Sequence, residues 1–191
     1  MSHSPRLEIV AHRSASYVPR TRENAESADL TIAVAVDYSS AGERLTKRSA
    51  GSKYLALPIS QDPLASARQL FSALKARGFL NGRRLPVLNV AGNGIYTLIK
   101  HGIDQAAADA HLFAIFSAMQ PHLPLGRVIS GGQTGIDVAG AVAGHALGLD
   151  VKMTLPAGFL QRDASGKDAP QNLEDLHAQI VRQADALRAM T

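Results

Sequence analysis

The chain has 191 residues, 46% of them hydrophobic, which is enough for one substantial core and does not require a second. It has no cysteine, which excludes disulfide bonds and thiolate zinc sites, and its net charge of +4 is compatible with a small anionic ligand without indicating a nucleic-acid surface. No apolar run reaches the roughly 18 residues that span a bilayer, and the opening MSHSPRLEIV lacks the apolar segment of a signal peptide, so we expect a cytoplasmic protein without membrane contact.

Apolar runs of strand length recur along the chain. Most of them are continuously apolar and rich in β-branched residues, which is typical of parallel strands that are covered on both faces. They occupy residues 7–12, 30–36, 54–58, 86–92, 127–130 and 151–156.

Helical patterns separate these runs. Asp62 is a good N-cap before Pro63, and its helix should end at Gly78. Further helices are predicted over residues 104–119 and from Asn172 to the end of the chain. The residues expected to face inward are Leu64, Ala67, Leu70, Phe71 and Leu74 in the first helix and Leu173, Leu176, Ile180, Ala184 and Leu187 in the last.

The alternation of strands and helices predicts an α/β fold, a doubly wound and mainly parallel sheet with helices on both faces. In such sheets, ligands bind beyond the carboxyl ends of the strands, where the strand order reverses. The residues that follow the apolar runs are therefore candidates for a site. They are residues 12–13, 37–42, 89–94, 131–137 and the stretch from 156 onward.

The sequence SGGQTGID, residues 130–137, is the most suggestive of these segments. Its glycines would let backbone N–H groups converge on a ligand at the positive end of the helix that follows. Alternatively, the glycines only make the turn, while Thr134 caps the helix and Asp137 closes a capping box. Asp137 disfavours a bare phosphate, so a ribose hydroxyl or an amine is its better partner. The candidate ligand-binding residues are Gly131, Gly132, Gln133, Thr134, Gly135 and Asp137.

The helix behind this loop is rich in small residues. Gly140 and Gly144 are four positions apart on one face, which predicts close packing against the sheet.

The run VISGGQTGIDVAGAVAGHALGLDVKMTLPAGF, residues 128–159, resembles the opening of the molybdenum-cofactor carrier protein family. That family shares a Rossmann-like fold with the lysine-decarboxylase-like phosphoribohydrolases and the DNA-processing DprA proteins. Three other segments resemble later parts of the same family. They are YVPRTRENAESADLTIAVA (17–35), AGERLT (41–46) and LPVLNVAGNGIYTL (85–98).

The matching blocks stand in swapped order. The resemblance therefore implies a circularly permuted single Rossmann-like domain over residues 1–191, in which residues 1–100 correspond to the family's C-terminal part and residues 125–191 to its N-terminal part. Neighbouring termini on a compact domain make such a rearrangement topologically simple. The run at 127–130 is then expected at the centre of the sheet, beside the run at 30–36.

The resemblance implies further binding residues in the first block. The guanidinium of Arg20 could hold a phosphate, with Asn24 on the same segment, although without the resemblance a solvated arginine is the favoured interpretation. Gly92 permits close approach of a ligand or of another backbone segment, and Asn93 suits a turn or a ligand contact.

The turn at Gly42 departs from the family pattern. Ala41 and Glu43 replace a glycine and a threonine of the family's Gly-Gly-Thr, and Thr46 stands where the phosphoribohydrolases carry a catalytic acid. Glu43 is the nearest acid left for that role.

Three functions are compatible with these residues. The first is binding of a nucleotide or nucleotide-derived small molecule at the glycine-rich loop. The second is an N-glycosidic-bond hydrolase acting on nucleoside monophosphates, in which Glu43 or Asp137 stabilises an oxocarbenium ion and Arg20 holds the phosphate. The third is a carrier of the molybdenum cofactor. These residues are compatible with an enzyme and with a binding protein that catalyses nothing.

Other segments carry weaker signals. Residues 156–171 form an aperiodic stretch of the length of a functional or disordered loop, in which Phe159 could stack on a base while Arg162 and Lys167 could reach phosphates. The histidines are scattered, so no metal site is indicated. The apolar surface of residues 112–119 could be a homodimer interface or part of the core.

Overall fold

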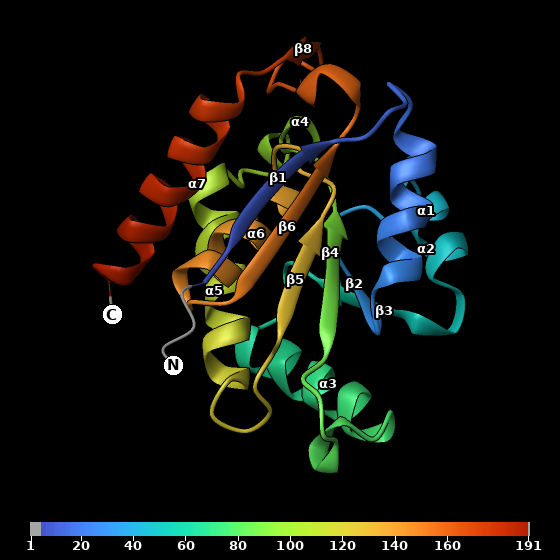
Figure 1. The fold of residues 1–191 in the computed structure, drawn as a ribbon, viewed down its shortest axis with the longest axis vertical. Helices are drawn as coiled ribbons and strands as arrows, with labels where there is room; N and C mark the ends of the chain where they lie inside the picture. The colour runs from blue at the N-terminus through green and yellow to red at the C-terminus, as the bar shows by residue number, and fades with distance from the viewer. Residues whose placement is uncertain (1–4, 191) are drawn as a thin grey trace.

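Six parallel strands form a single twisted sheet in the computed structural model, which describes residues 5–190 (Figure 1). Their order across the sheet is β1-β6-β5-β4-β2-β3, and every neighbouring pair is parallel. The strands are β1 (Leu7–Ala11), β2 (Leu30–Ala35), β3 (Tyr54–Pro58), β4 (Val87–Gly92), β5 (Arg127–Ser130) and β6 (Asp150–Leu155). The α/β prediction is confirmed, and each apolar run became a strand within about one residue of its expected ends. Residues 1–4 and 191 of the expected domain lie outside the described residues.

Helices cover both faces of the sheet, but unequally. On one face lie α3 (Pro63–Ala76), α5 (Gln105–Met119), α6 (Ile136–Ala146) and α7 (Leu173–Arg188), with the short α4 (Ile95–Ile99) after β4. The opposite face carries only α1 (Tyr17–Ser27) and α2 (Ala41–Ala50), which pack against each other (Figure 1). Short 3-10 turns follow α2, α3 and β6 at Gly51–Lys53, Phe79–Asn81 and Ala157–Phe159.

The predicted helix starts are confirmed by side-chain caps. Asp62, Asp104 and Asn172 each accept a hydrogen bond from a backbone N–H in the first turn of α3, α5 and α7. Of the residues expected to face inward, Leu64 and Leu173 are instead 49% and 43% exposed. Both stand in the first turn of their helix, at the border of the core.

The two faces of the sheet differ in side-chain size because alternate strand residues point to opposite faces. Toward α3, α5, α6 and α7, the sheet presents large apolar side chains that form the main core, among them Ile32, Val34 and Val90. Toward α1 and α2, β2 and β4 present Thr31, Ala33, Ala35, Asn89 and Ala91. These smaller side chains leave space beneath α1 and α2.

Close packing of α6 on the sheet is confirmed. A Cβ on Gly140 would lie 2.5 Å from Val90, and one on Gly144 would lie 2.9 Å from Val128. The apolar residues of α5 are also part of this core. Leu112, Ile115, Phe116 and Met119 are almost fully buried within the protomer, so they do not form an exposed dimer surface.

One expectation about strand order is wrong. The strand at Arg127–Ser130 is central, as expected, but it pairs with β4 and β6 and not with β2. After β3 the chain crosses back over β2 through α3, and this places β4 between β2 and β5.

The stretch after β6 is more ordered than its sequence suggests. It forms a small antiparallel hairpin of β7 (Leu160–Arg162) and β8 (Asp168–Pro170) before α7. The end of α7 lies near the start of β1 in Figure 1, and the two elements are in contact. Among residues 5–190, no helix is long and apolar enough to cross a membrane.

Candidate functional site

A cavity of about 630 Å³ lies between α1, α2 and the carboxyl ends of β4 and β5. It brings together residues from five segments of the chain, which lie within residues 17–24, 40–48, 89–97, 131–137 and at Arg162, and parallel strands that end at one edge of a sheet account for this meeting of distant segments. The predicted site residues that line it are Arg20, Asn24, Gly42, Glu43, Gly92, Asn93, Gly131, Gln133 and Asp137.

Gly132, Thr134 and Gly135 do not line the cavity. The Thr134 hydroxyl donates to the carbonyl of Arg162, so the interpretation of Thr134 as a helix cap is wrong. The N-cap of α6 is Gly135, with φ of 93° and no side-chain cap. A Cβ at that position would lie 2.6 Å from the carbonyl oxygen of Asn93, because the segment after β4 packs directly against the loop.

Three backbone N–H groups of the glycine-rich loop, those of Gly132, Gln133 and Gly135, already have partners. The N–H of Gly132 donates to Ser130 Oγ at 3.3 Å and that of Gln133 to Asp137 Oδ2 at 3.4 Å. The N–H of Gly135 donates to Gln105 Oε1 at 2.6 Å, and Gln105 Nε2 returns a bond to the carbonyl of Gly135 at 2.9 Å. The loop is therefore held by the protein itself, and the groups it offers to a ligand are chiefly side chains.

Nothing in the sequence pointed to Gln105 as a residue of the site. Asp109, one turn later on α5, accepts from Gln105 Nε2 at 2.8 Å and from Gln183 Nε2 at 3.1 Å. Burial raises the pKa of Asp109 to about 6. This network of side-chain hydrogen bonds fixes the start of α6 from the side of the sheet on which α5 and α7 pack.

A buried ion pair is part of the lining of the cavity. Arg20 and Asp137 are 5% and 7% exposed, and Arg20 Nη1 lies 3.6 Å from Asp137 Oδ2. Burial raises the pKa of Asp137, while the positive Arg20 opposes that rise. Arg20 Nε has no partner within residues 5–190, although the guanidinium lies 5.4 Å from the centre of the Tyr17 ring.

Glu43 is a second buried acid in the cavity. It stands in the first turn of α2, where its N–H donates to the capping Ser40 hydroxyl at 3.2 Å. Oε1 makes only a long contact of 3.5 Å with Asn93 Nδ2, and Oε2 is without a partner in the described part of the chain. Burial, and then the negative charges of Asp137 and Asp37, raise the pKa of Glu43 to about 7.

Asn93 is mainly a bracing residue. Its Oδ1 accepts from the N–H groups of Val36 and Asp37 at 2.9 and 3.0 Å, and its Nδ2 donates to the carbonyl of Asp37 at 2.9 Å. The side-chain amide thus ties the segment after β2 to the end of β4.

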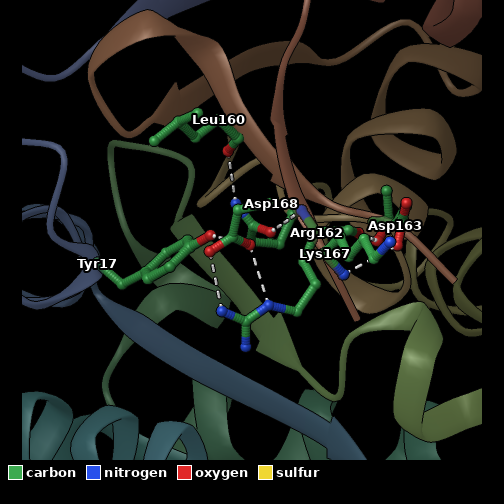
Figure 2. Close-up of polar contacts among 8 residues, drawn as sticks. Tyr17, Leu160, Arg162, Asp163, Lys167 and Asp168 are labelled. Atoms are coloured by element: carbon green, nitrogen blue, oxygen red, sulfur yellow. Dashed lines mark hydrogen bonds and ion pairs between the residues drawn. The ribbon is translucent and has the colours of Figure 1, made fainter. Parts of the chain in front are cut away.

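The β7–β8 hairpin borders the cavity, because Arg162 is part of the lining. Figure 2 shows Tyr17 and Arg162 both directed at Asp168. Tyr17 Oη donates to Asp168 Oδ1 at 2.8 Å, and Arg162 donates through Nε and Nη2 at 2.9 Å each. Burial and Asp168 raise the pKa of Tyr17 to about 12, so its phenol stays protonated and donates.

Gln133 joins the hairpin to the glycine-rich loop. Its Nε2 donates to the carbonyl of Leu160 at 2.8 Å, and its Oε1 accepts from the N–H of Arg162 at 2.9 Å. Of the residues proposed for this segment, Arg162 lines the cavity, whereas Phe159 packs against the core and Lys167 does not line it.

Replacing Asp168 with asparagine should loosen the hairpin. Arg162 and Tyr17 would lose their shared anionic acceptor, and amide hydrogen exchange over residues 160–170 should become about tenfold faster. Hydrogen-exchange mass spectrometry measures this directly. The matched variant Asp185→Asn removes an exposed partner of Arg188 at 2.6 Å on α7 and should leave the hairpin unchanged. Equal exchange at residues 160–170 in wild type and Asp168→Asn would show that the carboxylate does not hold the hairpin.

Comparisons of the chain with protein-family models, curated proteins and solved structures give no match.

Proposed function

We propose that the cavity binds a nucleotide or nucleotide-derived small molecule. The observation that carries the proposal is its place at the carboxyl ends of central parallel strands, with a volume typical of small-molecule sites. Two buried polar atoms of its lining, Arg20 Nε and Glu43 Oε2, have no partner in the described residues. Such atoms are costly to leave unpaired, and a ligand with hydroxyl groups would satisfy them.

The charges of the lining favour a ligand with separate polar and anionic ends. Glu43 and Asp137 are buried acids, which suit hydroxyl groups of a sugar better than a phosphate. Arg48 and Arg162 also line the cavity and are exposed, so a phosphate can reach them from the solvent side.

The specific observation that favours an enzyme is the pKa of Glu43. With a pKa of about 7, this carboxyl group is about half protonated at neutral pH, which suits a general acid or base. In hydrolysis of a nucleoside monophosphate, the bond from the sugar C1′ to the base nitrogen breaks and water forms a new C1′–O bond. The proton lost by water is taken up by the departing base, and in this proposal Glu43 relays it.

Thermal denaturation with a ligand panel tests the proposal. AMP, ADP-ribose and a pterin represent nucleotides, their derivatives and the organic part of the molybdenum cofactor. At about 100 times Kd, a true ligand should stabilise by about 2.7 kcal/mol and raise Tm by roughly 5–10 °C. Absence of any shift with all three, in a protein that melts cooperatively, would reject the proposal. Release of free base from AMP, lost in Glu43→Gln, separates the enzyme from the binding protein.

The permuted order of the chain is part of the same proposal. β6 and β1 are parallel neighbours, and α7, which follows β6, is in contact with β1. A helix in this position normally connects two such strands directly as a β-α-β unit. The arrangement of β6, α7 and β1 therefore supports the permuted order that we propose.

A further inference from the structure

Three neutral polar side chains line the part of the cavity farthest from the strand ends. Asn24, Thr46 and Asn89 are 5%, 6% and 3% exposed, and they come from α1, α2 and β4. Asn24 is about two helical turns beyond Tyr17, and Asn89 is three residues before Gly92, so each lies roughly 10 Å along its element from the strand-end side of the cavity.

Most of the hydrogen-bonding groups of these side chains are unused. Within residues 5–190, the amide of Asn24 and the hydroxyl of Thr46 make no hydrogen bond. Asn89 Nδ2 donates to Thr31 Oγ1 at 3.2 Å, which leaves its Oδ1 without a partner. Buried polar side chains in proteins are normally paired, so two amides and a hydroxyl with unused groups in one cavity point to a ligand that pairs them.

The shape of this deep end suits a flat group. Its floor is the sheet face at Asn89 and Ala91, and its walls are α1 and α2, with Leu45 as an apolar contact. A planar ring can enter between the helices and the small side chains of the sheet, with its edge toward the amides.

The charges around the deep end disfavour an anion there. Arg20 is already paired with Asp137, and Glu43 adds a second acid. The remaining arginines of the lining, Arg48 and Arg162, are exposed. A phosphate is therefore better placed on the solvent side and a neutral ring at the buried side.

We infer that the deep end of the cavity is a subsite for the hydrogen-bonding edge of a neutral planar heterocycle, such as a nucleobase, recognised by Asn24, Thr46 and Asn89. This inference rests on the proposed function, and it adds the orientation of the ligand and the residues that determine base specificity.

The test compares Asn24→Leu with wild type by isothermal titration calorimetry. The probes are AMP, adenosine and ribose 5-phosphate. Leucine keeps the size of asparagine but removes its donor and acceptor, so Kd for AMP and adenosine should rise at least about tenfold. Kd for ribose 5-phosphate should stay within about twofold. Asn81→Leu, the same change at an exposed position outside the cavity, should alter none of these constants. Thr46→Val repeats the test on α2 in case Asn24→Leu does not fold, which the melting curve shows.

The outcomes separate the two proposals. Equal weakening of ribose 5-phosphate and adenosine, or no weakening of adenosine, would overturn the base subsite while leaving nucleotide binding in place. Equal affinity of the wild type for AMP and for ribose 5-phosphate would also overturn the base subsite, because the base would then contribute nothing to binding. If wild type binds none of the three probes, the proposed function itself fails, and the subsite with it.

Discussion

Alanine at position 131 is expected to break the buried ion pair of the site. A Cβ on Gly131 would lie 2.5 Å from Arg20 Cζ and would overlap both Arg20 Nη1 and Asp137 Oδ2. The Arg20 guanidinium must then withdraw, which leaves the carboxylate of Asp137 buried without its countercharge. Loss of one partner from a buried pair costs roughly 3–5 kcal/mol, so the free energy of unfolding at pH 7 should fall by that amount. Urea denaturation measures it.

A matched glycine gives the control for this experiment. A Cβ on Gly42 would meet only Ser40 Oγ at 4.0 Å, and Gly42 lies within α2, so Gly42→Ala should be neutral or stabilise by up to about 1 kcal/mol. Adding Asp137→Asn should recover part of the loss in Gly131→Ala, because a neutral amide needs no countercharge. If the Gly131→Ala protein is as stable as Gly42→Ala, the ion pair of Arg20 and Asp137 does not require a glycine at position 131.

The sheet was predictable because its strands are buried on both faces. A run such as Leu30–Ala35 is almost fully buried, so its whole sequence is apolar apart from Thr31, and no other local structure explains it. The start of α3 was also predictable, because the Asp62 cap and Pro63 at the first helical position favour a helix start independently of the rest of the fold. The position of β4 between β2 and β5 was not predictable, because it depends on how α3 returns the chain.

The candidate site shows the same division. Residues after the strands, such as Gly92 and Asp137, meet because parallel strands end at one edge of a sheet. The role of Gly131 differs from the one expected for a flexible turn. Gly132 and Gly135 have positive φ values of 71° and 93°, whereas Gly131 does not and is instead pressed against Arg20.

Long-range contacts had no local signal. Tyr17 and Asp168 are 151 positions apart, and Gln105 is 30 positions from the glycine whose N–H it holds. A glutamine at the start of a helix looks like any solvated residue in the sequence. Only the packing of α5 beside the loop gives Gln105 a role, and that packing occupies the N–H of Gly135, one of the groups that the glycine pattern had suggested for a ligand.

Replacing Glu43 with glutamine should make stability less dependent on pH. The pKa of Glu43 rises from its ordinary value of 4.5 to about 7 on folding, so its neutral form is favoured in the folded state. This contribution is fully present below pH 4.5 and is lost as the pH rises through about 7. Glutamine stays neutral throughout. The stability of Glu43→Gln relative to wild type should therefore increase by about 3 kcal/mol between pH 4.5 and pH 8.5.

Urea unfolding at the two pH values, for wild type and variant, gives this difference. Carboxyl groups that do not interact with Glu43, such as Asp109, are present in both proteins and cancel from the comparison. Glu174→Gln, at an exposed position in the first turn of α7, is the control and should show a constant difference. If Glu43→Gln is also constant, Glu43 is ionised across this range and cannot relay a proton at neutral pH. That result would reject Glu43 as the acid of the proposed hydrolase. It would leave the proposal of nucleotide binding intact, because binding does not require Glu43 to titrate.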